Sequence, residues 1–307
     1  MQEAILLFFQ RIAFPLLDQA AEIITMMGED VIVISLMVVI FLAVDKKKGF
    51  VISIDLLASM LCMSTLKAIV RQPRPFLVIE GLDAKRVETA TGYSFPSGHT
   101  TTSSSFYSAI AYNFRKKGLS IVCAILILLI GLSRMYLGVH WPLDVVCGWI
   151  LGITITFALN DLLMKLFENE RTMMLFTVIS GSVTAIGGLI MSSLVTASLI
   201  DATAFSDFSK LLGISCGALF GFALEERFGR FSVDGIFREK FFRTIIGLLS
   251  MIFIRSGLKA LFPENVFFDW LRYVILGIWT FGLYPIIGLK IKLFRPEIPQ
   301  KTGSSNS

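Results

Sequence analysis

The two histidines of the chain, His99 and His140, are the residues best suited to chemistry, and both lie among small and cationic residues. His99 ends a Pro-Ser-Gly-His segment, directly before a helix-compatible stretch that begins at Thr100. Free N–H groups at a helix start favour phosphate, and Ser97 is of a type that caps helices. Gly98 lets a ligand approach the backbone. The segment therefore predicts a phosphate-binding helix start; a plain capped helix with an incidental histidine is the alternative.

His140 lies four residues before Asp144 and six after Arg134. Pro142 suits the first turn of a helix, because its missing N–H has no partner to lose there. Asp144 then falls in that turn and can reach back to His140. A carboxylate on one imidazole nitrogen fixes the tautomer and leaves the other nitrogen free to attack. The spacing predicts an oriented nucleophile, with Arg134 holding the same phosphate; a surface histidine beside a helix start is the alternative.

A third polar group lies near the end of an upstream apolar segment. Lys67 falls inside that segment, where a charge costs about 2.5–3.5 kcal/mol on insertion scales. Arg74 follows and Pro75 fixes the exit. Arginine offers a planar fork to phosphate oxygens, and lysine acts as a compact point charge. We predict an anion site here; a snorkelling lysine with interfacial arginines is the alternative.

Composition places these residues in a membrane protein. The chain has 307 residues, of which 55% are hydrophobic and only 17% are charged, whereas soluble domains carry about 25% charge. Its net charge of +5 does not indicate nucleic acid, because lysine and arginine concentrate in cytoplasmic loops of membrane proteins. The four cysteines have no paired spacing, and no Asp/Glu or Cys/His cluster indicates a metal. We expect no cofactor and no nucleic-acid partner.

The apolar segments predict an all-α, polytopic membrane helical bundle of about nine transmembrane spans. Residues 1–27 mix charged and apolar residues, which suits an amphipathic helix at the membrane surface. The expected spans are 30–44, 49–70, 97–114, 118–137, 143–167, 172–199, 208–225, 241–261 and 267–291. We divide the chain into a catalytic core at 1–170, additional transmembrane helices at 171–294 and a disordered tail at 295–307.

Basic residues fix the expected orientation. They fill the links that follow alternate spans, at 46–48, 115–117 and 227–243, and they recur after the last span. Such links face the cytoplasm. All three polar groups then lie at outward-facing helix ends. We expect an integral protein of a bacterial cytoplasmic membrane with its active site facing outward.

Together the three segments resemble the signature of the type 2 phosphatidic acid phosphatase superfamily: Lys-x6-Arg-Pro, Pro-Ser-Gly-His and Ser-Arg-x5-His-x3-Asp. Its positions are filled by Lys67, Arg74, Pro75, Pro96, Ser97, Gly98, His99, Ser133, Arg134, His140 and Asp144. The resemblance covers residues 20–165 and implies a helical bundle with a two-step, metal-independent reaction. The additional spans after residue 170 depart from the compact members of the superfamily.

The resemblance implies a role for each residue. His140 would attack phosphorus and form a phosphohistidine, Asp144 would orient it, and His99 would protonate the leaving oxygen. The phosphoryl oxygens would be bound by Lys67, Arg74, Ser97, Gly98 and Arg134. The predicted function is hydrolysis of the terminal phosphate of a lipid phosphate or lipid pyrophosphate drawn from the bilayer. A lipid phosphotransferase using the same histidine and a non-catalytic phospholipid transporter or scramblase stay open.

Overall fold

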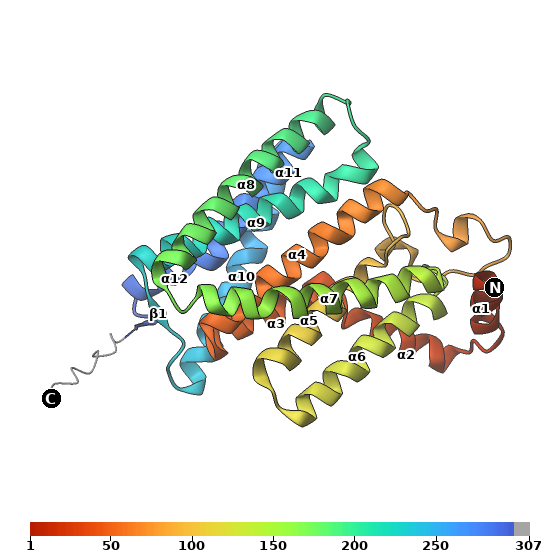
Figure 1. Ribbon diagram of the computed structural model, residues 1–307, viewed down its shortest axis with the longest axis horizontal. Coiled ribbons are helices and arrows are strands. Elements are labelled where there is room, and N and C mark those ends of the chain that lie inside the picture. Colours follow the sequence, from red (N-terminus) through yellow and green to blue (C-terminus); the bar gives the residue numbers. More distant parts are fainter. Residues whose placement is uncertain (298–307) are drawn as a thin grey trace.

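The computed structural model describes residues 1–297 and is a bundle of long helices (Figure 1). The helices are α1 Gln2–Arg11, α2 Pro15–Met26, α3 Asp30–Val39, α4 Lys46–Val70, α5 Gly98–Phe114, α6 Lys117–Tyr136, α7 Pro142–Leu166, α8 Glu170–Thr196, α9 Ala202–Phe228, α10 Phe237–Leu261, α11 Val266–Ile278 and α12 Tyr284–Lys290. Shorter helical turns are η1 Ile40–Val44, η2 Pro75–Leu77, η3 Val87–Thr89 and η4 Trp279–Leu283. The predicted all-α membrane bundle is confirmed, with most helix ends within a few residues of the expected positions.

The amino-terminal segment differs from the single helix that the sequence predicts. It forms two helices, α1 and α2, because Pro15 occupies the first turn of α2 and holds Phe14 in an extended conformation. α2 and the α3–η1 segment are bent by 46° and together are apolar enough to form one broken membrane span. A single span formed by this pair would include part of the segment that we expected at the membrane surface.

Within residues 1–297, seven helices are long and apolar enough to cross a membrane, and the bent pair makes up to eight. α5 is not among them, because it is a 17-residue helix rich in serine and threonine. Several of its hydroxyls donate within the helix, as where Ser104 Oγ donates to the Thr100 carbonyl at 2.6 Å, and the Ser105 hydroxyl pairs with Ser59 of α4 and Thr156 of α7. Residues 100–109 of α5 are buried against its neighbours. The count of nine spans stays a prediction, since it requires α5 to cross.

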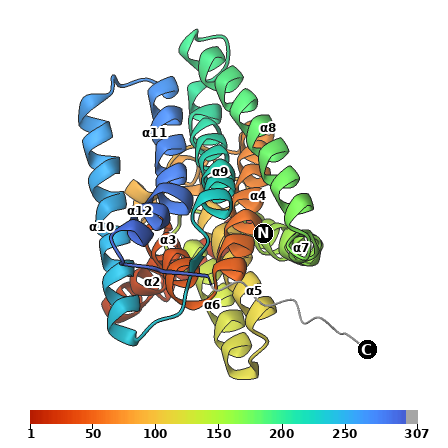
Figure 2. The same ribbon diagram turned by 90° about the vertical axis from the view of Figure 1, so that its left-hand side faces the viewer.

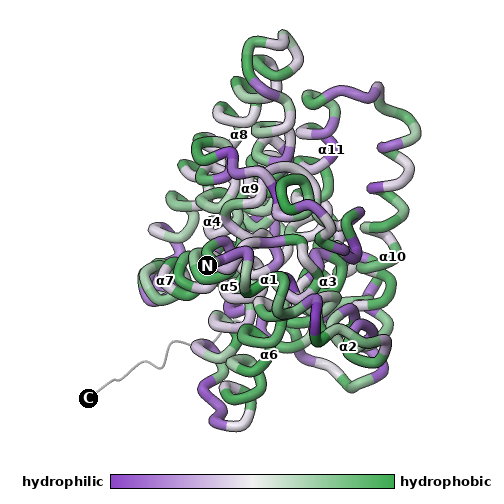
Figure 3. The backbone as a smooth tube through the Cα atoms, turned by 90° about the vertical axis from the view of Figure 1, so that its right-hand side faces the viewer, coloured by the Kyte–Doolittle hydropathy of each residue, from purple (hydrophilic) through white to green (hydrophobic). Residues whose placement is uncertain are grey.

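The predicted basic links gather at one end of the bundle, which we call the basic end. Lys46, at the start of α4, pairs with Glu226 near the end of α9 at 2.7 Å. Arg230 pairs with Glu170 at the start of α8. The backbone coloured by hydropathy shows hydrophilic residues concentrated near the helix ends and mostly apolar helix bodies between them (Figure 3). The segments that carry the two histidines lie at the other end, which we call the site end.

Close approach of α5 and α7 brings the two histidine segments together. A Cβ atom added at Gly148 would lie 2.9 Å from Thr100 Cβ and 3.2 Å from the Ser97 carbonyl oxygen. One added at Gly152 would lie 2.7 Å from both Thr101 O and Ser105 N. Small residues allow such backbone contact between membrane helices. Nothing in the local sequence marks these two glycines as contact positions.

The helices after residue 170 form a second layer beside the core (Figures 1 and 2). Within it α9 packs against α8 and α11, and α9 also contacts α4 of the core. Gly213 and Gly221 allow the close approach of α9 to the α11–η4 segment, as small residues at a helix interface do. The layer is joined to the core by stacked rings of Phe50 and Phe222, whose centroids are 3.8 Å apart.

The predicted tail begins later than expected. Arg295 and Pro296 form the two-residue strand β2, which pairs antiparallel with β1, Phe231–Ser232. Glu297 N also donates to the Arg230 carbonyl at 2.7 Å. Residues 295–297 are therefore fixed by backbone hydrogen bonds, and residues 298–307 of the predicted tail lie outside the described part.

Substitution by alanine should have opposite effects at two helical glycines, one outside the α5–α7 contact and one within it. Gly257→Ala in α10 should stabilise the protein by about 0.5–1 kcal/mol, because alanine favours a helix interior and no atom lies within 4 Å of the added Cβ. Gly152→Ala should destabilise it, since overpacking typically costs about 1–3 kcal/mol. Thermal unfolding in detergent measures both variants, and a raised midpoint for Gly152→Ala would contradict the packing.

Candidate active site

The link between α6 and α7 holds His140 against Asp144. The backbone N–H of Trp141 donates to Asp144 Oδ2 at 2.8 Å, which fixes the carboxylate in the first turn of α7. His140 Nδ1 lies 3.3 Å from the same oxygen. Both side chains are buried. The structure thus brings these two residues together as the spacing predicts.

Arg74 determines which nitrogen of His140 carries the proton. Its Nη1 lies 3.2 Å from His140 Nε2. A guanidinium group can only donate, so Nε2 accepts and Nδ1 carries the proton toward Asp144. Burial, together with the positive charges of Arg74 and Arg134, lowers the pKa of His140 well below its ordinary range. The imidazole is therefore neutral near pH 7, with its lone pair on Nε2.

Arg74 and Lys67 converge on one turn of backbone at residues 91–93. Arg74 Nη2 donates to the Thr91 carbonyl at 2.6 Å, and its Nε donates to the Gly92 carbonyl at 3.0 Å. Lys67 Nζ donates to the Tyr93 carbonyl at 2.6 Å. Both charges are thus satisfied by neutral backbone oxygens in place of carboxylates. Such partners leave the positive charge of the pair available to an anion.

The start of α5 is fastened to the start of α7. Ser97 N donates to the Asp144 carbonyl oxygen at 3.0 Å. The Ser97 hydroxyl accepts from Thr100 N at 3.4 Å and so caps the helix as predicted. A Cβ atom at Gly98 would meet only Met63 Cε, at 3.9 Å, so protein packing does not explain the glycine. His99 is half-buried, and its Nε2 has no hydrogen-bond partner among residues 1–297.

Arg134 is fully buried, but it does not contact His140 directly. Its Nη1 donates to Thr25 Oγ1 at 2.9 Å, and its Nη2 donates to Thr89 Oγ1 at 3.5 Å. α2 and η3 therefore hold this guanidinium by neutral hydroxyls. Its charge still acts on His140. Arg134 therefore belongs to the same group of positive charges around His140 as Arg74 and Lys67.

Ser94 is a site residue that sequence reasoning missed. Its hydroxyl donates to Asp144 Oδ2 and lies 3.4 Å from His140 Nδ1. It therefore holds the carboxylate on the side facing the histidine. A serine two residues before Pro96 carries no local signal of this role, because its partners lie 46 and 50 residues away. Thr25, which contacts Arg134, was missed for the same reason.

The polar loop between α4 and α5 is fastened by the amino-terminal helices. Lys85 Nζ pairs with Asp18 of α2 at 2.5 Å, and Arg86 pairs with Glu29. The side chain of Gln10 donates to the Gly81 carbonyl at 3.0 Å. These contacts tie the loop to α1, to α2 and to Glu29 directly before α3.

The second helical layer also contacts the loop that holds Arg74 and Lys67. The Tyr93 hydroxyl donates to Asp201 Oδ2 at 3.0 Å. Asp201 also caps α9, since its Oδ1 accepts from Thr203 N at 2.9 Å. The hydrogen bond raises the pKa of Tyr93, and the backbone bond from Thr203 lowers the pKa of Asp201. One carboxylate thus joins the start of α9 to the 91–93 turn.

Comparison with known families agrees with this geometry. The profile of the PAP2 superfamily matches residues 49–168, which contain all three polar groups. A second profile, described as the transmembrane extension of PAP2 superfamily phosphatases, matches residues 209–296. The chain belongs to the PAP2 superfamily. The two matches fall on either side of the boundary predicted near residue 170, which itself stays a prediction.

Curated relatives of this PAP2 chain are membrane lipid phosphatases. It is 34% identical over 115 residues to an undecaprenyl-diphosphatase of Sulfolobus acidocaldarius, a match covering 36% of this chain and 53% of the relative. It is 37% identical over 76 residues to phosphatidylglycerophosphatase B of Bacillus subtilis, covering 22% and 37%. A lipid A 1-phosphatase of Rhizobium johnstonii is 41% identical over 80 residues, covering 24% and 32%. The matched segment spans about half or less of each relative.

Two solved structures also align with part of the chain. The crystal structure of Aquifex aeolicus LpxE is 24% identical with a TM-score of 0.45, covering 50% of this chain and 90% of that one. A phosphatidylglycerolphosphate phosphatase from Bacillus subtilis is 26% identical with a TM-score of 0.45, covering 53% and 85%.

The hydrogen bond between Tyr93 and Asp201 predicts that Asp201, the cap of α9, also orders the loop at residues 89–97. Asp201→Ala should destabilise the protein by about 0.5–2 kcal/mol, as loss of a cap does. It should also speed backbone hydrogen exchange in residues 89–97, because Tyr93 loses its partner in α9. Mass spectrometry of exchanged peptides measures this change.

Asn169→Ala is the matched control, because Asn169 caps α8 through the same kind of bond at the basic end. It should lower the stability of the protein by an amount similar to Asp201→Ala and leave hydrogen exchange in residues 89–97 unchanged. Equal exchange in both variants would show that the contact does not order the loop.

The lowered pKa of His140 predicts a specific loss of stability in acid. In the unfolded chain His140 takes up a proton near pH 6.5, whereas the folded chain resists this. Stability should therefore fall as the pH drops below about 6.5, by at most about 1.4 kcal/mol per pH unit. The His140→Gln variant should lack the part of the pH dependence of stability that His140 contributes. The unfolding midpoint should fall less between pH 7 and pH 5 in the variant than in the wild type; parallel falls would contradict the assignment.

Proposed function

We propose that this protein is a membrane phosphatase that removes the terminal phosphate of a lipid phosphate or lipid pyrophosphate. The observation that carries the proposal is the state of His140: Nδ1 is bound to Asp144, and Nε2 presents a lone pair among buried cations. An oriented, neutral imidazole is what nucleophilic attack requires. Binding of a headgroup alone would not require this orientation.

The reaction proceeds in two steps through a phosphohistidine. His140 Nε2 attacks phosphorus, the bond from phosphorus to the lipid oxygen breaks, and His99 supplies a proton to that oxygen. Water then attacks the phosphohistidine, His99 accepts a proton from it, and the N–P bond breaks to release phosphate. Asp144 accepts the Nδ1 hydrogen bond throughout, which stabilises the positive charge that develops on the ring.

Arg74 and Lys67 bind the phosphoryl oxygens by giving up the backbone carbonyls that accept their hydrogen bonds in the structure. Arg74 and Lys67 donate to the carbonyls of residues 91–93, and these neutral acceptors are weaker than phosphate oxygens. Arg74 Nη1 must also leave His140 Nε2 before that lone pair can attack. Binding of a phosphate to Arg74 would therefore free the nucleophile. Ser97, the amide of Gly98 and Arg134 complete the proposed phosphate site.

The relatives support the substrate class, because undecaprenyl diphosphate, phosphatidylglycerophosphate and lipid A 1-phosphate all carry a terminal phosphate on a lipid. The two ends of the bundle support the orientation. The basic end is expected to face the cytoplasm by the positive-inside rule, so the site end faces outward. A lipid in the outer leaflet would then present its phosphate at the level of the histidines.

His140→Ala should lower phosphate release from a purified sample by about 10³-fold or more, as loss of a catalytic nucleophile does. The assay measures free phosphate from a panel of lipid phosphates and pyrophosphates in detergent with EDTA. EDTA should leave the wild-type rate unchanged, because cations of the protein neutralise the phosphate. The control is Lys116→Ala at the basic end, which should turn over like the wild type.

Three outcomes would replace this proposal. Wild-type-like turnover by His140→Ala would exclude His140 as the nucleophile. Transfer of labelled phosphate to an added alcohol in preference to water would indicate a phosphotransferase using the same histidine. Lipid redistribution in liposomes that persists in His140→Ala, with no phosphate release by the wild type, would indicate a transporter.

A further inference from the structure

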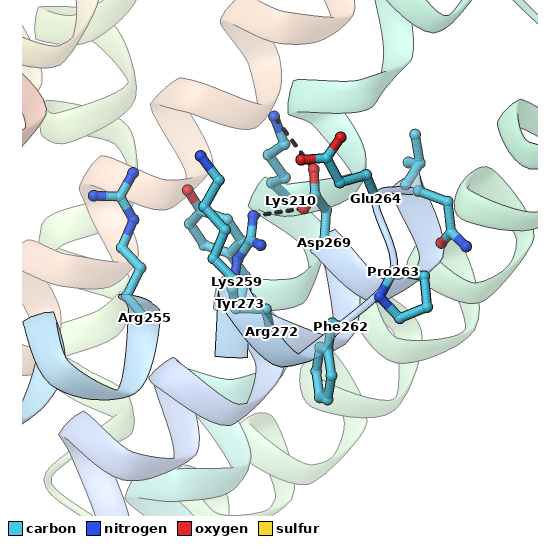
Figure 4. A pocket seen from close by; sticks show the side chains of 11 residues that line it. Lys210, Arg255, Lys259, Phe262, Pro263, Glu264, Asp269, Arg272 and Tyr273 are labelled. Atoms are coloured by element: carbon cyan, nitrogen blue, oxygen red, sulfur yellow. Dashed lines mark hydrogen bonds and ion pairs between the residues drawn. The ribbon is translucent and has the colours of Figure 1, made fainter. Parts of the chain in front are cut away.

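A pocket of about 460 Å³ lies at the site end of the second helical layer, away from the histidines (Figure 4). It is bounded by the first turns of α9, the last turns of α10, the link at residues 262–265 and the start of α11. The residues that decide its chemistry are Lys210, Arg255, Lys259, Glu264, Asp269 and Arg272. Four of them are cations and two are acidic, so the lining is net positive.

Two of the cations are neutralised within the pocket wall. Asp269 pairs with Arg272 through Oδ1 at 2.5 Å and lies 3.8 Å from Lys210 Nζ. Lys210 also pairs with Asp207 at 2.9 Å. These four residues of α9 and α11 form an ion-pair network that fixes one side of the pocket.

Arg255 and Lys259, on the other side, have no hydrogen bond or ion pair from their side chains to any residue within 1–297. They lie four residues apart, so they share one face of α10. Figure 4 shows both side chains extending toward the pocket. α10 carries no charged residue from Thr244 to Ile254. An isolated cation in such a helix is costly unless it lies near the interface or has a partner.

The rest of the lining combines an apolar wall with this charge. Phe262 and Tyr273 line the same pocket. Arginine offers a fork to phosphate oxygens and lysine adds a point charge. The Tyr273 ring beside two unpaired cations fits a phosphate group that is attached to an apolar body. A small carboxylate ligand would use the charge but not the adjoining aromatic surface.

We propose that this pocket binds the phosphate of an anionic lipid headgroup, at a second site distinct from the histidines. Arg255 and Lys259 hold the phosphate, and Phe262 and Tyr273 contact the adjoining lipid. The site requires neither His140 nor turnover, so it does not depend on the proposed reaction. Lys210 lies on α9, whose N-cap residue Asp201 accepts a hydrogen bond from Tyr93 in the loop of the phosphatase site. The bound lipid would therefore lie on the same side of the bundle as the phosphatase site.

The test compares lipid retention by two double variants of the full chain. Arg255→Gln with Lys259→Gln removes the proposed phosphate ligands. Arg238→Gln with Lys240→Gln is the matched control, because it removes two charges from the basic end of the same helix. Each protein is placed in nanodiscs of phosphatidylcholine with a minor share of phosphatidylglycerol, a phosphodiester with no terminal phosphate to release. Native mass spectrometry then counts the phosphatidylglycerol molecules retained.

We expect the wild type and the control to retain phosphatidylglycerol over phosphatidylcholine. The pocket variant should lose at least about tenfold in relative affinity, which corresponds to one charge-assisted hydrogen bond. Arg255→Lys with Lys259→Arg should retain the lipid, because both charges remain. Equal retention by the wild type and the pocket variant would overturn the proposal.

A second arm separates a lipid headgroup from free phosphate. Inorganic phosphate is titrated against each protein in nanodiscs of phosphatidylcholine alone. Phosphate binding that the pocket variant loses, with no preference for phosphatidylglycerol, would overturn the lipid assignment in favour of a soluble phosphate. If thermal unfolding shows that the double variant is not folded, the single variant Lys259→Gln decides the question. The exposed Lys259 side chain has no partner to lose within residues 1–297.

Discussion

The first turn of α7 is the constraint on which the site depends, because Asp144 joins three segments there. Its carboxylate accepts from Trp141 N and Ser94 Oγ and lies beside His140 Nδ1, while its backbone carbonyl accepts from Ser97 N. One residue therefore caps α7, orients the histidine and fastens the start of α5. The contact is possible only because Gly148 and Gly152 let α5 lie against α7.

The charges of the site are buried without acidic partners of their own. Arg74 and Lys67 donate to backbone carbonyls, and Arg134 donates to threonine hydroxyls. Burying a cation is expensive unless hydrogen bonds compensate it, and neutral acceptors compensate without cancelling the charge. The same group of charges that keeps His140 neutral thus remains free to bind phosphate. A site built from ion pairs would be less able to bind an anion, because the carboxylates would cancel its positive charge.

The second helical layer is more than an addition to the core. It contacts the site loop through Asp201 and Tyr93, and the aromatic contact of Phe50 with Phe222 fixes its position against α4. The proposed lipid pocket is built wholly from this layer. On these proposals, this chain holds a phosphate at two places at the site end, one with a nucleophile and one without.

Local sequence determined the helices, the two ends of the bundle and the motif residues, because apolar length, charge placement and short spacing act within one or two helical turns. The spacing of His140 and Asp144 predicted their contact for this reason. Sequence did not determine the acceptors of Arg74 and Lys67, the roles of Ser94 and Thr25, or the pairing of residues 295–296 with 231–232. Those contacts join residues far apart in the chain. Only the packing of helices decides them, since a hydroxyl or carbonyl carries no local mark of the partner it will meet.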